Sequence, residues 1–235
     1  MANLSTKWIK VSEPARHVLL VELARFWQEY GKLFESISAE VPDVRAVVLS
    51  SVFPEIFSAG LDYFHKQIIP FQKAITAPER CLFPVIAAVH GMVVGLGVDM
   101  ISACDIRYAA SNAKFTIKVY IGLAADMGSL AYLPKITGNM SFIREMAYTA
   151  QWFPASKAEQ IGLVSKVVEG GRDEVVAAAL EVAQLIATKS LIAVTGTKRL
   201  LSHARDHSVS ENLEYTTLWN SAMLQTKSRS RCRSL

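Results

Sequence analysis

The sequence lacks most of the short motifs by which enzymes and binding modules are recognised. Its three cysteines have no CxxC spacing, and its five histidines have no HxH or HExxH spacing. These absences predict neither a metal site nor a structural disulfide framework. GxGxxG, GxSxG and a Gly-Lys-Ser/Thr phosphate loop are also missing. Their absence argues against dinucleotide binding, Walker-type phosphate binding and a Ser-His-Asp hydrolase.

Long apolar runs and charge of one sign are also scarce. No apolar run approaches the roughly 20 residues that a membrane span needs, so we expect no membrane span. Residues 1–17 lack the apolar stretch of a signal peptide. The net charge is only +4, and residues 227–235 hold four basic side chains and no acidic one. Because this basic run has no aromatic or recognition-helix context, we expect a disordered tail and no nucleic-acid partner.

What the chain does contain is an alternation of strands and helices. Apolar, β-branched runs predict strands at 17–23, 45–51, 84–89, 105–110 and 164–169. Helical stripes lie between them, and everything after Gly170-Gly171 is helical in pattern. This order predicts an α/β core over 1–170 and a C-terminal helical module over 171–226. Apolar residues such as Leu218 and Trp219 could pack on the core or on another subunit, and the sequence leaves both open.

Two glycine-containing turns follow predicted strands. They are FSAGLDY (57–63), which comes after strand 45–51, and HGMVVGLGVD (90–99), which comes after strand 84–89. Glycines between a strand and a helix let backbone N–H groups point at an incoming oxygen. Two such turns side by side would supply the two donors that an oxyanion needs. The alternative is that the glycines only permit tight turns and close packing.

Lone carboxylates stand beside these turns in apolar surroundings. Asp99 is flanked by Val98, Met100 and Ile101, and Asp126 follows Leu123-Ala124-Ala125. A carboxylate in such a setting needs a partner or a function, because its burial is costly. For Asp126 the structural alternative is N-capping of a helix over 128–137. Asp62 can similarly cap the next helix, Asp105 is expected to be structural, and His90 is expected to be a core residue.

Four blocks of the chain together resemble the enoyl-CoA hydratase/isomerase (crotonase) superfamily. They are FSAGLD, PVIAAVHGMVVGLGVDMISACDIRYAA, IGLAADMGSLAYLPKITGN and AEQIGLVSKVVE. Within it, GVDMISACDIRYAA with IGLAADMGSL looks most like the Δ3,5-Δ2,4-dienoyl-CoA isomerases. The resemblance implies an α/β fold of the crotonase (ClpP-like) type, a spiral of β-β-α units with a C-terminal helical oligomerisation module. It also implies a homotrimer or homohexamer acting on a fatty-acyl-CoA in peroxisomal or mitochondrial β-oxidation.

The resemblance also assigns site residues by their matching positions. The thioester carbonyl would lie between the backbone N–H groups of Ala59 and Leu96, which stabilise a dienolate. Asp99 and Asp126 would move a proton from C2 to C6, shifting 3,5 double bonds to 2,4. No cofactor and no metal are implied, because coenzyme A is part of the substrate. The remaining substrate-binding positions would be Ser58, Gly60, Leu61, Asp62, Gly95 and Gly97.

The sequence departs from the family pattern in three places. The family motif Lys-Glu-Val-Asp-x-Gly-Leu, whose Glu is a third catalytic carboxylate, is one residue shorter at 118–123 and lacks the Glu. An Asn-Arg-Pro…Asn-Ala segment that helps to hold coenzyme A is missing after strand 17–23. The stretch between Asp62 and Pro84 is also about a helix shorter. Hydratase activity is disfavoured, because it needs two glutamates. The alternative to an isomerase is a catalytically impaired crotonase-fold subunit that binds acyl-CoA or only assembles with active relatives.

Overall fold

A computed structural model describes residues 4–6, 9–23, 27–41, 43–58, 68–117 and 124–224. Its centre is a six-stranded sheet of order β1-β2-β3-β5-β7-β10, in which only β1 runs antiparallel to its neighbour. Five of these strands are the ones that the apolar runs predict. The bounds are β1 Ile9–Ala15, β2 Val18–Leu23, β3 Ala46–Ser51, β5 Val85–Val89, β7 Ile106–Ala110 and β10 Lys166–Val168.

A second, smaller sheet stands beside the first and was not predicted as strands. Its order is β4-β6-β8-β9, with bounds β4 Ile56–Ser58, β6 Met92–Val94, β8 Lys114–Thr116 and β9 Phe153–Pro154. Each of its first three strands follows a strand of the large sheet and is followed by a helix: β3-β4-α2, β5-β6-α4 and β7-β8-α5. This succession is the predicted spiral of β-β-α units.

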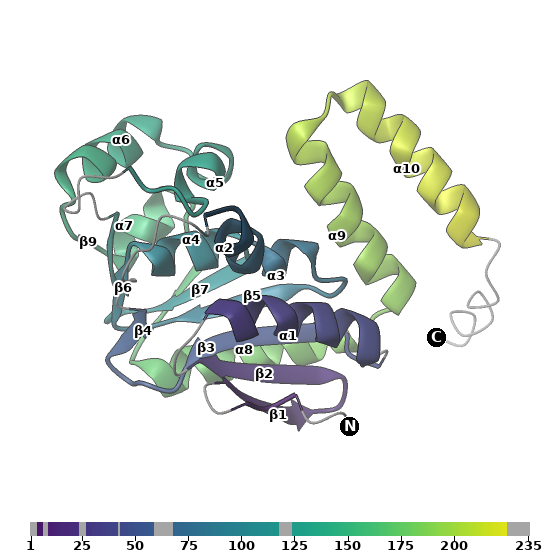
Figure 1. Cartoon of the computed structure of the whole chain (residues 1–235), viewed down its shortest axis with the longest axis horizontal. Coiled ribbons are helices and arrows are strands. Elements are labelled where there is room, and N and C mark those ends of the chain that lie inside the picture. Colours follow the sequence, from purple (N-terminus) through teal and green to yellow (C-terminus); the bar gives the residue numbers. More distant parts are fainter. Residues whose placement is uncertain are drawn as a thin grey trace.

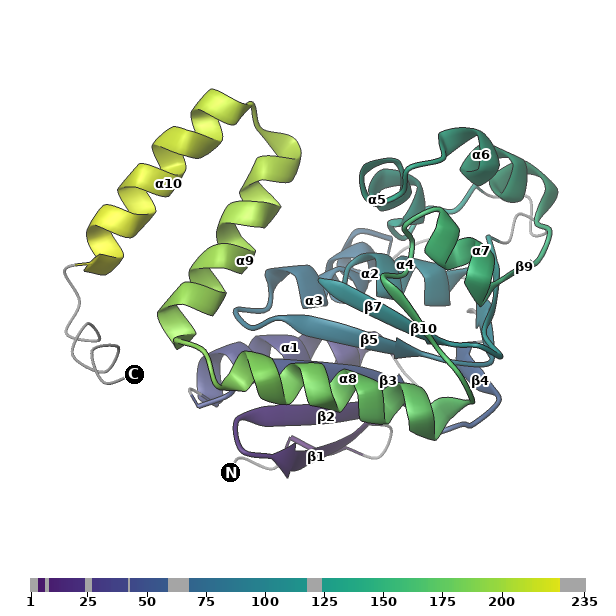
Figure 2. The same cartoon turned by 180° about the vertical axis from the view of Figure 1, so that it is seen from behind.

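Helices cover both faces of the large sheet (Figure 1). One face carries α1 Trp27–Glu40, α2 Ile68–Ile75, α3 Ala77–Arg80 and α4 Leu96–Ser102. The opposite face carries α8 Arg172–Ala187, which lies along the strands when the molecule is seen from behind (Figure 2). Val175, Ala179 and Ala183 of α8 are fully buried against this face. Small alanine side chains allow the helix to approach the sheet closely and bury the apolar residues that drive folding.

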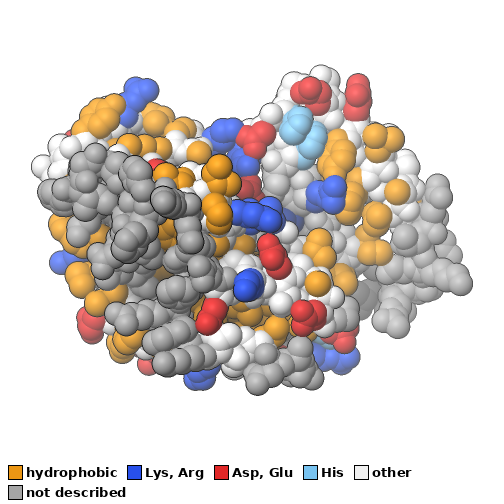
Figure 3. Space-filling model, in the orientation of Figure 1, with side chains coloured by type: hydrophobic (Ala, Val, Ile, Leu, Met, Phe, Trp, Pro, Cys, Tyr) orange, Lys and Arg blue, Asp and Glu red, His pale blue; other side chains and the backbone are white. Residues whose placement is uncertain are grey.

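Three more helices, α5 Ser129–Ile136, α6 Met140–Thr149 and α7 Ala155–Gln160, form a group at one end of the molecule. At the other side, α9 Leu191–Asp206 and α10 Val209–Leu224 form a pair that projects from the body (Figures 1 and 2). No described residue of α10 is buried. Apolar side chains gather on this pair (Figure 3), among them the exposed Leu201, Leu213 and Leu218.

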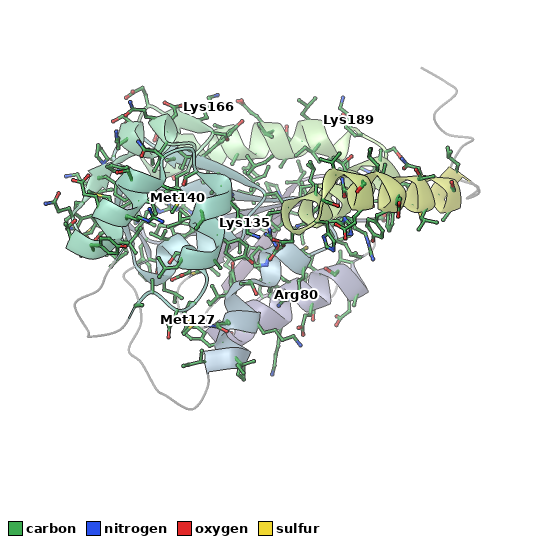
Figure 4. All side chains as sticks on the ribbon, turned by 90° about the horizontal axis from the view of Figure 1, so that it is seen from above. Arg80, Met127, Lys135, Met140, Lys166 and Lys189 are labelled. Atoms are coloured by element: carbon green, nitrogen blue, oxygen red, sulfur yellow. The ribbon has the colours of Figure 1, made fainter. Side chains whose placement is uncertain are left out.

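Polar contacts fasten α9 to the body. The Lys198 ammonium is buried and donates to Asp105 Oδ2 at 2.7 Å, to Pro78 O at 2.8 Å and to Phe83 O at 3.0 Å. These three acceptors match the three donors of an ammonium group. Asp105 also accepts the Val85 N–H at 2.7 Å, which confirms its structural role. Near the end of α9, Lys135 of α5 pairs with Asp206 (Figure 4).

Among the described residues, no single helix has the length and apolar composition to cross a membrane. Helices α8 and α9 meet that test only in combination, across a bend of 113°. The predicted basic tail at 227–235 lies outside the described residues.

Candidate active site

The start of α4 and the end of β4 meet in the structure. A Cβ added to Gly97 would lie 2.9 Å from the Cβ of Ser58, so only glycine permits this approach. Gly95 is the N-cap residue of α4, and its N–H donates to Thr116 O of β8 at 3.0 Å. Four of the predicted substrate-binding and oxyanion positions therefore lie together: Ser58, Gly95, Leu96 and Gly97.

Leu96 is the first residue of α4 and is half-buried. The N–H groups in the first turn of a helix have no acceptor within the helix, so they can donate to a bound oxygen. The second predicted donor, Ala59, directly follows Ser58 in the chain but lies outside the described residues, as do Gly60, Leu61 and Asp62. The structure therefore places Leu96 at a helix start, and the oxyanion roles of Leu96 and Ala59 both stay predictions.

Asp99 lies one helical turn after Leu96 and is only 4% exposed, as the apolar sequence around it predicted. Its Oδ1 accepts the backbone N–H of Ser129, the first residue of α5, at 2.6 Å. Burial raises the pKa of the Asp99 carboxyl, and the negative charge of Asp126 raises it further. The contact with Ser129 acts in the opposite direction and does not outweigh burial. The structure therefore disfavours the ionised form of Asp99 relative to an aspartate in water.

Asp126 is half-buried in the segment that leads into α5. Its backbone carbonyl accepts a hydrogen bond from the side-chain amide of Gln72 on α2. Met127, the next residue, is buried, and Figure 4 places it on the part of the chain that passes α2. The N-cap residue of α5 is Gly128, so the N-cap alternative for Asp126 is wrong. The carboxylate that accepts from the first turn of α5 belongs to Asp99 instead.

Two contacts of this site were not predicted from the sequence. Ser129 holds Asp99 across 30 positions, and Gln72 holds the Asp126 carbonyl across 54 positions. A serine directly after Gly128 is a signal for a helix start, but nothing in the sequence indicates which carboxylate it faces. Gln72 lies in a segment of mixed composition that carries no comparable signal.

The arrangement can perform proton transfer next to a stabilised oxyanion. A helix-terminal N–H is suited to an oxygen that gains negative charge, and two interacting carboxylates lie close by. The described residues hold no group of three or more His, Cys, Asp or Glu side chains that could bind a metal ion. The chemistry that Asp99 and Asp126 themselves can supply is acid–base chemistry.

The β-β-α spiral and the C-terminal helices define a protein of the crotonase fold. Residues 9–233 match the family described as Enoyl-CoA hydratase/isomerase, and the chain belongs to that family. Among solved structures it is similar to enoyl-CoA hydratase from Bacillus anthracis, with a TM-score of 0.82 and 25% identity over 95% of this chain and 93% of that one. It is also similar to a probable enoyl-CoA hydratase/isomerase from Mycobacterium abscessus, with a TM-score of 0.82 and 26% identity over 92% of this chain and 90% of that one.

Among characterised sequences, the chain is similar to proteins named Δ3,5-Δ2,4-dienoyl-CoA isomerase. The human mitochondrial protein is 41% identical, over 93% of this chain and 76% of that protein. The Arabidopsis thaliana peroxisomal protein is 40% identical, over 85% of this chain and 78% of that protein. The alignment with the human protein spans 251 positions, although this chain has only 235 residues. The relative therefore has residues that this chain lacks.

The raised pKa of Asp99 leads to a prediction about stability. The pKa of Asp99 is higher in the folded protein than in the unfolded chain. At pH values between these two pKa values, the folded state therefore binds more protons than the unfolded state. Stability from this group is therefore present at low pH and is lost as the pH rises through the folded pKa. We expect Asp99→Asn, whose amide oxygen can still accept the Ser129 N–H, to raise the melting temperature by a few degrees at pH 7. Thermal unfolding at pH 7 and at pH 4 should show this gain shrinking at pH 4. A large loss of stability at pH 7 would instead make the Asp99 carboxylate a structural requirement.

Proposed function

We propose that this chain isomerises 3,5-dienoyl-CoA thioesters to 2,4-dienoyl-CoA in fatty-acid β-oxidation. The observation that carries the proposal is the buried carboxyl of Asp99 one helical turn after Leu96, with a pKa that burial and the charge of Asp126 both raise. The similarity to dienoyl-CoA isomerases over most of the chain supports it. Because those relatives are named mitochondrial and peroxisomal, we place the activity in one of these two compartments.

In the proposed reaction the thioester carbonyl lies between the N–H groups of Leu96 and Ala59. Removal of a proton from C2 moves electron density onto this oxygen and gives a dienolate, which the two donors stabilise. Return of a proton at C6 completes the shift of the double bonds. Asp99 is suited to donate this proton because burial raises its pKa. We assign the removal of the first proton to Asp126. Proton exchange between the two carboxyls then restores the starting state.

The chain's own residues supply every group in this scheme, and coenzyme A enters only as part of the substrate. Ser58, Gly95 and Gly97 would shape the pocket next to the thioester, together with Gly60, Leu61 and Asp62. The exposed apolar side chains on α10 support assembly into a homotrimer or homohexamer through the C-terminal helices. We propose the domain division at residue 170 because every described element after it is a helix, although the first of these, α8, packs on the large sheet.

A second candidate is a catalytically impaired crotonase-fold subunit that binds acyl-CoA or assembles with active relatives. The observation in its favour is the segment at 118–123, which lacks the glutamate of the family motif. This chain also lacks residues that the human isomerase has within their alignment, which likewise favours an impaired subunit.

One assay separates these two candidates. The purified full chain is mixed with 3,5-octadienoyl-CoA, and the ultraviolet absorbance of the conjugated 2,4-product is followed. Turnover establishes that Asp99 and Asp126 suffice without the glutamate. If a folded, oligomeric sample shows no turnover, titration with octanoyl-CoA decides the rest. Tight binding then identifies a binding subunit, and absence of binding identifies an assembly subunit.

A further inference from the structure

His90 ends the run that forms β5 and lies between the two sheets, fully buried. Its Nε2 lies 2.9 Å from the backbone carbonyl oxygen of Phe53. Its ring also meets the Phe57 ring edge to face, with centroids 6.1 Å apart. His90 therefore contacts the chain immediately before β4 and again within it.

The neighbours of His90 bind the same segment through the backbone. The Met92 N–H donates to Glu55 O at 3.0 Å. Gly91 has a φ of +58°, and a Cβ at this position would lie 1.9 Å from Glu55 O. Residues 90–92 thus hold the turn at 53–55 by one side-chain and one backbone hydrogen bond. This turn sets where β4 begins, and therefore where Ser58 lies.

The same short stretch also leads to the other half of the site. From Gly91 the chain forms β6, whose pairing with β4 aligns Ser58 with Val93, and then reaches Gly95 and Leu96. His90 is thus connected to Leu96 through the five residues 91–95, and its own side chain contacts Phe53 before β4 and Phe57 within it.

The imidazole has one defined role in this arrangement. A carbonyl oxygen only accepts hydrogen bonds, so Nε2 carries the proton and donates it to Phe53. Nδ1 is buried and has no hydrogen-bond partner in the part of the chain that the structure describes. Burial lowers the pKa of His90 and outweighs the backbone carbonyls of Phe53 and Ala88, which raise it, while the charges of Arg172 and Asp173 have smaller, opposing effects. The ring is therefore neutral, with a fixed tautomer.

We propose that His90 is a positioning residue of the site, which fixes the end of β4 at Ser58 relative to the donor at Leu96 through its bond to Phe53. This inference deepens the proposed function and rests on it. A leucine would fill the same space without leaving a nitrogen unpaired. What the imidazole adds is the Nε2–H hydrogen bond to the Phe53 carbonyl, which holds the turn at 53–55 that leads to Ser58.

The experiment uses the full chain with three substitutions at one position. His90→Gln places an amide donor where Nε2 stands, His90→Asn offers a donor too short to reach it, and His90→Leu removes the donor. We expect His90→Leu and His90→Asn to lower kcat for 3,5-octadienoyl-CoA by about 10–100-fold, because misplacing one donor forfeits part of its effect. KM should change little, since the bond acts on the charge of the transition state. His90→Gln should restore kcat to within about threefold.

Amide hydrogen exchange of residues 53–58 provides a second readout that does not depend on turnover. We expect faster exchange in this segment for His90→Leu and His90→Asn, and wild-type exchange for His90→Gln. Unchanged exchange and kcat in His90→Leu would overturn the inference, as would a His90→Gln protein that behaves like His90→Leu. If the wild-type chain itself does not turn over substrate, the proposed function fails. The exchange of residues 53–58 then still decides whether His90 holds this turn.

Discussion

Replacing Asp126 by Asn is expected to lower kcat for the isomerisation of 3,5-octadienoyl-CoA by about 10²–10⁴-fold, the usual contribution of a general acid or base. Asn keeps the size and polarity of the side chain but cannot accept the C2 proton. The contact that holds this segment to α2 uses the Asp126 backbone carbonyl and the Gln72 amide, and the substitution leaves both unchanged. The loss should therefore appear in kcat, measured by ultraviolet absorbance of the conjugated product, and little in KM.

A matched control is available at the opposite end of the sheet. Asp43 is exposed and lies just before β3, so Asp43→Asn makes the same chemical change away from the site. It should leave kcat unchanged. Asp99→Asn should lose activity on the scale of Asp126→Asn, and the double variant should lose less than the product of the two effects, because the carboxyls act as one unit. Wild-type rates in both single variants would remove the acid–base assignment.

The large sheet could be predicted from the sequence because its central strands, β3 and β5, are buried on both faces. Continuous apolar, β-branched runs such as 45–51 and 84–89 are typical of that environment. β1 gives no such signal because it is an edge strand that carries Lys10, Ser12 and Glu13. Strands β4, β6 and β8 have three residues each, which is too short for any periodicity to show. Their position depends on pairing with each other, and a single sequence does not reveal that pairing.

The site was predictable to a similar extent. The apolar neighbours of Asp99 indicated a buried carboxylate, and the structure confirms it. The sequence left open whether Asp126 capped the helix that follows it, because a single sequence does not show which carboxylate lies at the start of that helix. In the structure the N-cap residue of α5 is Gly128, and the carboxylate that accepts the Ser129 N–H belongs to Asp99. His90 was correctly expected in the core, but its bond to Phe53 joins positions 37 apart and could not be inferred from a strand pattern.

The junction between the two sheets depends on one glycine, and Gly91→Ala is expected to be the most damaging single substitution for stability. The native φ of +58° costs an alanine about 1–3 kcal/mol. The added Cβ would also lie 1.9 Å from Glu55 O and 2.2 Å from Glu55 C, which are backbone atoms that cannot turn aside. Relief requires the 53–55 turn to move, at a further cost of about 1–3 kcal/mol or more. We expect a total loss of about 4 kcal/mol, measured by urea unfolding.

Gly138→Ala is the matched control for this substitution, because its Cβ would meet only Ile161 O, at 3.9 Å. Gly138 is exposed, and the hydrogen bond from its N–H to Ile161 O survives the change. It should alter the free energy of unfolding by less than about 1 kcal/mol, as surface substitutions usually do. Equal stability of the two variants would mean that the turn at 53–55 adapts freely. The oxyanion geometry would then not be set from β5, because the same turn that clashes with residue 91 leads to Ser58. A large loss confined to Gly91→Ala would instead support a rigid path from β5 to the site.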